Sequence, residues 1–367
     1  MRRYLISFAI GGLGGTIFWL LSMPLAFMLG ALTAVAIFAF GGGKAAFPSR
    51  LRPWVLASIG TTLGANVTPD TVHGFLLWWP GLVGVCLFVG IAGAGSVWLA
   101  QKLAGFDRKT AIFAGVPGGF SEMVVLAEAH GCNVRLVALV HALRVTLVAF
   151  LVPFAASWIT PAPVGAVAAP RPILHIWEIG PESWIWLCAA IPAGIGFGGL
   201  CRLPSPYILG PMLLSSVLHG LGLTDFRLPF EILVLAQISL GTMIGTRFLG
   251  ASWREILRYL PYTLASLLYL LTLTLLFAML MSRAFGMPLV AGVLAYAPGG
   301  FAEMGMMAIV LGVDPGFVGL HHLLRMVVIN FTVPVVLRLT RGQDWQSGMT
   351  QATAPRPRDL RQGRGSG

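Results

Sequence analysis

The sequence predicts an all-α protein that crosses a membrane many times and is built from two homologous repeats. The composition supports this fold class, because 57% of the 367 residues are hydrophobic and only 10% are charged. Soluble domains carry about 25% charged residues. One stretch of the chain occurs twice, and each copy holds Pro-Gly-Gly inside an apolar run, where a spanning helix is expected to break.

The two copies of this stretch begin at Pro117 and Pro298, an offset of 181 residues that continues without a gap. Both read P-G-G-F-x-E-M, followed by a Gly, then H-x-x-R, then a Pro. A second motif, S-x-G-T-x-x-G, occupies 58–64 and 239–245 at the same offset. Recurrence at a fixed spacing is the signature of an internal repeat. We therefore expect both halves to share one fold.

Apolar segments divide each half into five to six transmembrane helices. In the first half they lie near 4–22, 24–42, 53–67, 77–101, 110–131 and 135–159. In the second half they lie near 183–200, 205–223, 229–247, 260–281, 288–311 and 316–340.

Changes in composition set the expected domain boundaries. The first membrane repeat covers 1–160, and the second covers 183–340. Between them, 161–182 is rich in Pro and Ala and is expected to be a linker. The end of the chain, 341–367, is rich in Gln, Pro, Gly and Arg, which predicts a disordered basic tail.

The relative orientation of the two repeats has two interpretations. Positive loops lie at 43–52 and 102–109 in the first half, and at 201–204 and 247–258 in the second. These loops are not equivalent in the repeat, so the positive-inside rule favours opposite orientations. Six segments per half and a basic tail favour the same orientation. We expect inverted repeats, in which one segment does not fully span or the linker crosses the membrane.

Helix geometry predicts where the charged residues of each copy lie. Gly131 and Asn133 predict a turn between two helices, as an exit glycine and an N-cap. Glu122 lies 11 residues before Asn133, and Arg144 lies 11 residues after it. At 1.5 Å per residue, both are roughly 16 Å from the turn, near the middle of a ~30 Å hydrocarbon core. The second copy repeats this spacing.

Ionisable residues inside a membrane are costly and mark functional sites by default. Four recur at matched positions: Glu122, Arg144, Glu303 and Arg325. One interpretation is a structural ion pair within each helical hairpin. The other is an anion site, in which the arginines supply planar donor forks and the glutamates bind a coupling proton or sodium ion.

The expected helix breaks would complete such a site. Half-helix N-termini present free N–H groups and the positive end of a dipole. The residues expected at the breaks are Pro117, Gly118, Gly119, Pro298, Gly299 and Gly300.

Further polar residues recur in both copies. His141 and His322 each precede an arginine by three positions and share its helix face. They could relay protons, although packed and satisfied histidines fit equally well. The hydroxyl residues of the second motif could line a cavity or bond to their own helices. These are Ser58, Thr61, Ser239 and Thr242. G-x-x-x-G pairs in the first and third segments predict close helix packing, or an interface between the two repeats or between the two chains of a homodimer.

The sequence gives no reason to expect several classes of function. The chain has no H-E-x-x-H, G-x-S-x-G, Walker loop or haem-ligand pattern, so we expect neither an enzyme nor a cofactor. Four cysteines without C-x-x-C spacing or a His/Cys cluster predict no metal site. The net charge of +11 comes from arginines in short loops and the tail, which is typical of membrane insertion. No nucleic-acid partner is expected.

With its A-G-V-P-G-G-F-S-E-M and Y-A-P-G-G-F-A-E-M stretches and their downstream H-x-x-R, the chain resembles the AbrB family of bacterial membrane proteins. The resemblance covers about residues 5–340. It implies a multi-pass protein of the bacterial inner membrane. Members of that family carry labels as regulators of gene expression, ammonia monooxygenases and transporters. The sequence holds no copper-ligand constellation and no soluble DNA-binding part.

The residues and the resemblance lead to two functional hypotheses. The first is a secondary transporter of a small organic, anionic solute coupled to protons or sodium, embedded in a lipid bilayer. The second is a membrane sensor or regulatory protein that affects gene expression indirectly and binds a ligand without moving it.

Overall fold

Helices make up all of the regular structure in the described part of the chain. The computed structural model describes residues 1–67, 77–159 and 174–352. The first half contains α1 (Arg2–Leu20), α2 (Ala26–Phe40), α3 (Arg52–Gly64), α5 (Trp79–Ala104), α6 (Arg108–Gly115), α7 (Phe120–Ala129) and α8 (Val134–Ile159). The second half contains α9 (Pro181–Leu200), α10 (Pro206–Gly220), α11 (Phe230–Gly245), the 3₁₀ turn η2 (Thr246–Phe248), α12 (Trp253–Phe285), α13 (Leu289–Tyr296), α14 (Phe301–Val310) and α15 (Pro315–Ala352).

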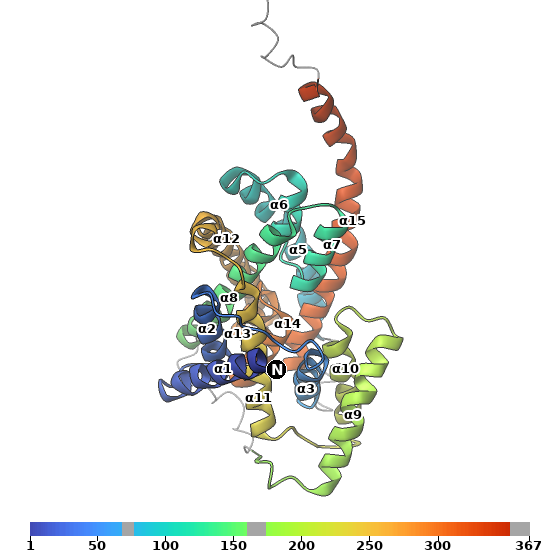
Figure 1. Ribbon diagram of the computed structural model, residues 1–367. Helices are drawn as coiled ribbons and strands as arrows, with labels where there is room; N and C mark the ends of the chain where they lie inside the picture. The colour runs from blue at the N-terminus through green and yellow to red at the C-terminus, as the bar shows by residue number, and fades with distance from the viewer. Residues whose placement is uncertain (68–76, 160–173, 353–367) are drawn as a thin grey trace, which may run out of the picture.

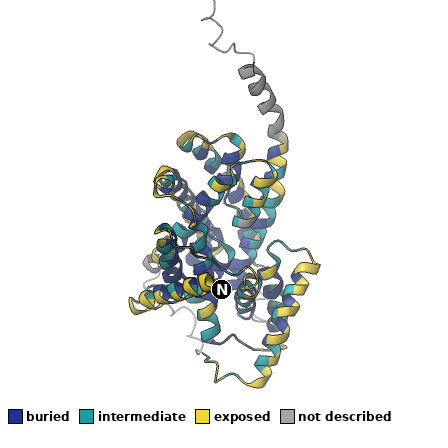
Figure 2. Cartoon of the chain, in the orientation of Figure 1, coloured by how far each residue is buried: buried dark blue, intermediate teal, exposed yellow. Residues whose placement is uncertain are grey.

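Six of the helices in the described residues are long and apolar enough to cross a membrane: α1, α5, α8, α9, α12 and α15. Large apolar side chains on their outer faces are exposed, among them Leu87 and Leu268. Figure 2 shows exposed residues along the outer helices and buried residues between them. Apolar surface of this extent is suited to lipid. The expected all-α class and the membrane-helix character are therefore confirmed.

The last three helices of each half, α6 to α8 and α13 to α15, occur in the same order and begin 181 residues apart. α6 and α13 both contain 8 residues and start at Arg108 and Leu289, which are 181 positions apart. α7 and α14 both contain 10 residues and start at Phe120 and Phe301, again 181 positions apart.

Close helix crossings join the two halves. α2 packs against α1 and α11, and α10 packs against α9 and α3, so each group of three takes one helix from the other half (Figure 1). Glycines permit these approaches. A Cβ atom at Gly60 would overlap the carbonyl oxygen of Ile208, and one at Gly241 would overlap that of Met28.

All four expected G-x-x-x-G pairs pack against another helix of the same chain. The pair in α9 contacts α10 within its own half, and the pairs in α3 and α11 contact the other half. The pair in α1 contacts both halves, because Gly15 packs on α2 and Gly11 lies close to Thr242 of α11. These motifs are thus used inside the protein.

The structure describes only parts of the expected linker and of the expected C-terminal tail. Most of the linker, 160–173, lies outside the described residues. The tail was expected from residue 341, but α15 continues to Ala352. Pro355 is the first proline after Pro334, so nothing in the sequence between them forces the helix to end. Residues 353–367 lie outside the described residues.

Candidate functional site

The site is built around two interruptions in the helical backbone. α6 ends at Gly115 and α7 begins at Phe120, while α13 ends at Tyr296 and α14 begins at Phe301. The intervening sequences are V-P-G-G and A-P-G-G. Each interruption leaves the last carbonyls of one helix and the first N–H groups of the next without partners in their own helix.

The two arginines of the H-x-x-R motifs bind the carbonyls at these interruptions. Arg144 donates to the carbonyl oxygens of Gly115 at 3.0 Å and Val116 at 3.3 Å. Arg325 donates to Ala297 and, at 2.7 Å, to Gly299. A guanidinium at the C-terminal end of a helix is also favoured by the helix dipole. The donor forks expected to bind a solute are therefore largely engaged by backbone.

The two histidines complete the same arrangement. His141 Nε2 lies 2.7 Å from the carbonyl oxygen of Phe113, and its Nδ1 lies 2.7 Å from Arg144. His322 has an equivalent carbonyl contact at 2.9 Å and lies 2.9 Å from Arg325. Because arginine can only donate, Nδ1 accepts and Nε2 carries the proton. Both histidines are buried and satisfied, which matches the packed interpretation and leaves no ring nitrogen for a relay.

The remaining residues of P-G-G-F-x-E-M pack on one another. A Cβ at Gly119 would overlap the carboxylate of Glu122, and a Cβ at Gly300 would overlap that of Glu303. Each carboxylate therefore folds back over the start of its helix, where the dipole favours negative charge. The helix N-termini are thus partly covered by their own glutamates. The phenyl ring of Phe120 meets the His141 ring edge-on, with 6.5 Å between centroids.

Gly300→Ala is expected to displace the Glu303 carboxylate and to lower the free energy of unfolding by about 1 kcal/mol, because the flexible carboxylate moves away and loses its place at the helix N-terminus. Thermal unfolding of the purified protein in detergent measures this. Gly199→Ala is the matched control, since a Cβ there meets no atom within 4 Å. Equal melting temperatures for the two variants would contradict the tight contact.

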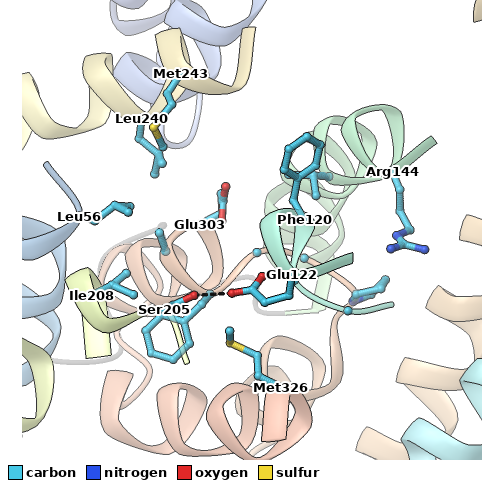
Figure 3. Close-up of a pocket in the computed structure, with 18 of the residues that line it drawn as sticks. Leu56, Phe120, Glu122, Arg144, Ser205, Ile208, Leu240, Met243, Glu303 and Met326 are labelled. Carbon is cyan, nitrogen blue, oxygen red and sulfur yellow. Dashed lines mark hydrogen bonds between the residues drawn. The ribbon is translucent and has the colours of Figure 1, made fainter. Parts of the chain in front are cut away.

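A cavity of about 120 Å³ lies where the two interrupted helices meet. Among the expected residues, its lining contains Glu122, Glu303, Arg144, Arg325, Gly118, Gly119, Pro298, Gly299 and Gly300. Pro117, His141 and His322 lie outside the lining. Figure 3 shows this cavity with both carboxylates pointing into the space between α7, α14 and the helices opposite.

The four hydroxyl residues of the S-x-G-T-x-x-G motifs do not line the cavity, so the cavity-lining interpretation of these residues was wrong. The Ser58 hydroxyl donates to the carbonyl of Trp54 at 2.9 Å, within its own helix. Thr242 is fully buried with its hydroxyl close to Gly11 of α1. Thr61 and Ser239 are also buried. The small residues of the motif in α3 pack on α10, and those of the motif in α11 pack on α2 and α1. Leu56, Leu240 and Met243 face the cavity instead.

Three polar residues of the cavity were not expected from the sequence. Ser205, just before α10, donates to Glu122 Oε1 at 2.9 Å (Figure 3). Arg247, in η2, places its guanidinium carbon 3.9 Å from the centroid of the Phe120 ring. Arg52 begins α3 and also contributes to the lining. The sequence analysis counted both arginines among the positive loops. Arg247 lies two residues after Gly245, the end of the second S-x-G-T-x-x-G motif, and this position could have indicated it.

The charges of the cavity are unequal in number. Four arginines and two glutamates of the described residues line it. In Figure 3 the Arg144 guanidinium lies away from the Glu122 and Glu303 carboxylates. The ion pairs seen in the described residues are Arg135–Glu255 at 2.8 Å and His175–Glu231 at 2.7 Å, both outside the cavity. The structural hypothesis of Glu–Arg pairs within each hairpin is therefore wrong, and the described residues that line the cavity include more arginines than glutamates.

Comparisons with known proteins agree on one family. The model of the AbrB family, described as "Transition state regulatory protein AbrB", matches residues 27–341. The chain is similar to a protein of Escherichia coli (strain K12) named "Putative regulator AbrB", with 28% identity over 86% of this chain and 90% of that protein. It is also similar to "Uncharacterized protein YhjN" of Bacillus subtilis (strain 168), with 29% identity over 70% of each chain. The chain belongs to the AbrB family.

Proposed function

We propose that this protein is a secondary transporter of the bacterial inner membrane that moves a small organic anion coupled to protons or sodium. The observation that carries the proposal is the cavity between two interrupted helices, which holds two carboxylates and an excess of arginines. Interrupted helices at a charged cavity are the usual site of solute and ion binding in secondary transporters. Non-helical backbone at membrane depth is tolerated where it lines such a cavity.

In this proposal the two halves are repeats, each with one helix broken at Pro-Gly-Gly, and they have opposite orientations in the membrane. The equal offset between the starts of α6 to α8 and those of α13 to α15, and the exchange of α3 and α11 between the halves, support a two-fold relation. Rocking of one helix group against the other around a fixed site would then expose the cavity to each side in turn.

The size of the cavity limits the solute. A volume of about 120 Å³ equals that of roughly four water molecules in the liquid. This is enough for a small organic acid and far too little for a lipid or a peptide. The carboxylates of Glu122 and Glu303 share the cavity with the solute, so protonation or sodium binding at either one changes its affinity for an anion.

Counterflow in proteoliposomes tests the transport proposal. Vesicles loaded with one unlabelled short carboxylate should accumulate the same labelled compound transiently, and a proton or sodium gradient should change the rate. Protein-free vesicles provide the control. Binding without any exchange across the bilayer, for every carboxylate that the purified protein binds, would contradict transport.

The second candidate function is a membrane sensor or regulator. The observation in its favour is the wording of the family description and of the E. coli relative, both of which refer to regulation. In that case a ligand would occupy the cavity and alter the contacts of the protein with a partner, with no counterflow.

A further inference from the structure

The arginines around the cavity differ in how far their donors are engaged. Arg144 and Arg325 are 2% and 5% exposed, and each binds carbonyl oxygens and a histidine. Arg247 forms neither a hydrogen bond nor an ion pair with any of the described residues, and its contact is the face of the Phe120 ring. Of these three arginines, Arg247 is therefore the one whose N–H edge is left for a ligand.

The contact with the Phe120 ring also fixes the position of the Arg247 guanidinium. A guanidinium whose carbon lies 3.9 Å over the centroid of an aromatic ring is held against the ring face by a cation–π interaction, which leaves its planar fork of N–H donors without a hydrogen bond to the described residues. Such a planar fork matches the two oxygens of a carboxylate. Phe120 is the first residue of α7, so the Arg247 guanidinium lies directly beside the helix that carries Glu122.

Arg247 has no counterpart in the other half. The position 181 residues before Arg247 is Asn66, so a second fork of this kind is absent from the equivalent place. One fork binds one carboxylate. The rest of the cavity wall includes Leu56, Ile208, Leu240, Met243 and Met326, which suit a short apolar body.

We propose that Arg247 binds the carboxylate of the solute and that the solute is a short-chain monocarboxylate. This inference rests on the proposed function in that it names the solute class of the same cavity. Glu122 and Glu303 then repel the bound carboxylate unless they are protonated or bind a cation, which links solute binding to the coupling ion.

Isothermal titration of the purified full-length protein tests the assignment with butyrate and its neutral analogue butyramide. The wild type should bind butyrate and not butyramide. Arg247→Gln should weaken butyrate binding at least tenfold. Arg247→Lys keeps the charge but not the fork, and should weaken binding several-fold. Arg254→Gln removes an exposed arginine of α12 and should leave binding unchanged.

Each result decides for or against the proposal. Wild-type affinity in a folded Arg247→Gln variant, equal binding of butyramide, or no butyrate binding by the wild type would overturn it. Should Arg247→Gln fail to fold, wild-type affinity in Arg247→Lys would overturn it as well. Preferential binding of inorganic phosphate would overturn the monocarboxylate class. If butyrate binding depends on Arg247 but no counterflow occurs, the transport proposal is contradicted and the binding site is supported. If counterflow occurs and Arg247→Gln leaves it unchanged, the binding site is contradicted and the transport proposal is supported.

Discussion

Replacing Glu122 and Glu303 together by glutamine is expected to abolish ion-coupled flux while the protein still folds and inserts. Both carboxylates line the cavity, and neither is neutralised by an ion pair with another described residue. Glutamine has nearly the same shape but cannot ionise, so it removes the site for a proton or sodium ion. The measurement is gradient-driven uptake of a labelled short carboxylate into proteoliposomes.

Glu128→Gln is the control for this experiment, because Glu128 is an exposed residue of the same helix, α7. It should transport at the wild-type rate. The two single variants separate the roles further, since Glu122 accepts a hydrogen bond from Ser205 whereas Glu303 is only 5% exposed and receives none from another side chain in the described residues. Unchanged coupled uptake in the double variant would exclude both carboxylates from coupling.

Replacing Arg325 by methionine is expected to lower the free energy of unfolding by about 2–3 kcal/mol. The substitution leaves the carbonyls of Ala297 and Gly299 without their donor, and each buried polar group without a partner costs about 1–3 kcal/mol. Removing a buried charge offsets part of this cost. The offset is small here because the guanidinium borders the cavity and is not sealed in protein. Thermal unfolding in detergent measures the loss.

Arg325→Lys should not restore stability, because one ammonium group cannot reach two carbonyls and His322 with a planar fork. Arg254→Met, at an exposed position, serves as the control. Arg144→Met should behave like Arg325→Met, since it has equivalent contacts 181 residues earlier. A wild-type melting temperature for both methionine variants would mean that these arginines do not hold the interrupted helices.

Local features of this protein were determined by the sequence alone. The turn expected at Gly131 and Asn133 is present, with Gly131 at φ +67° and the Asn133 side chain accepting the N–H of Leu136 at 3.1 Å. Asp314 caps the matching turn by accepting the N–H of Gly316 at 2.7 Å. These contacts join residues two or three positions apart, so residue type and spacing are sufficient to predict them. The helical class likewise follows from long apolar runs.

The roles of the charged side chains were decided only by the tertiary structure. The sequence placed Arg144 and Arg325 at matched depths, yet their partners are carbonyls about 28 residues away, at the helix interruptions. Ser205 meets Glu122 across 83 residues. The contact between Arg247 and Phe120 joins the two halves. Spacing along a helix fixes which face a side chain occupies, but the acceptor it meets depends on how distant helices pack against that face.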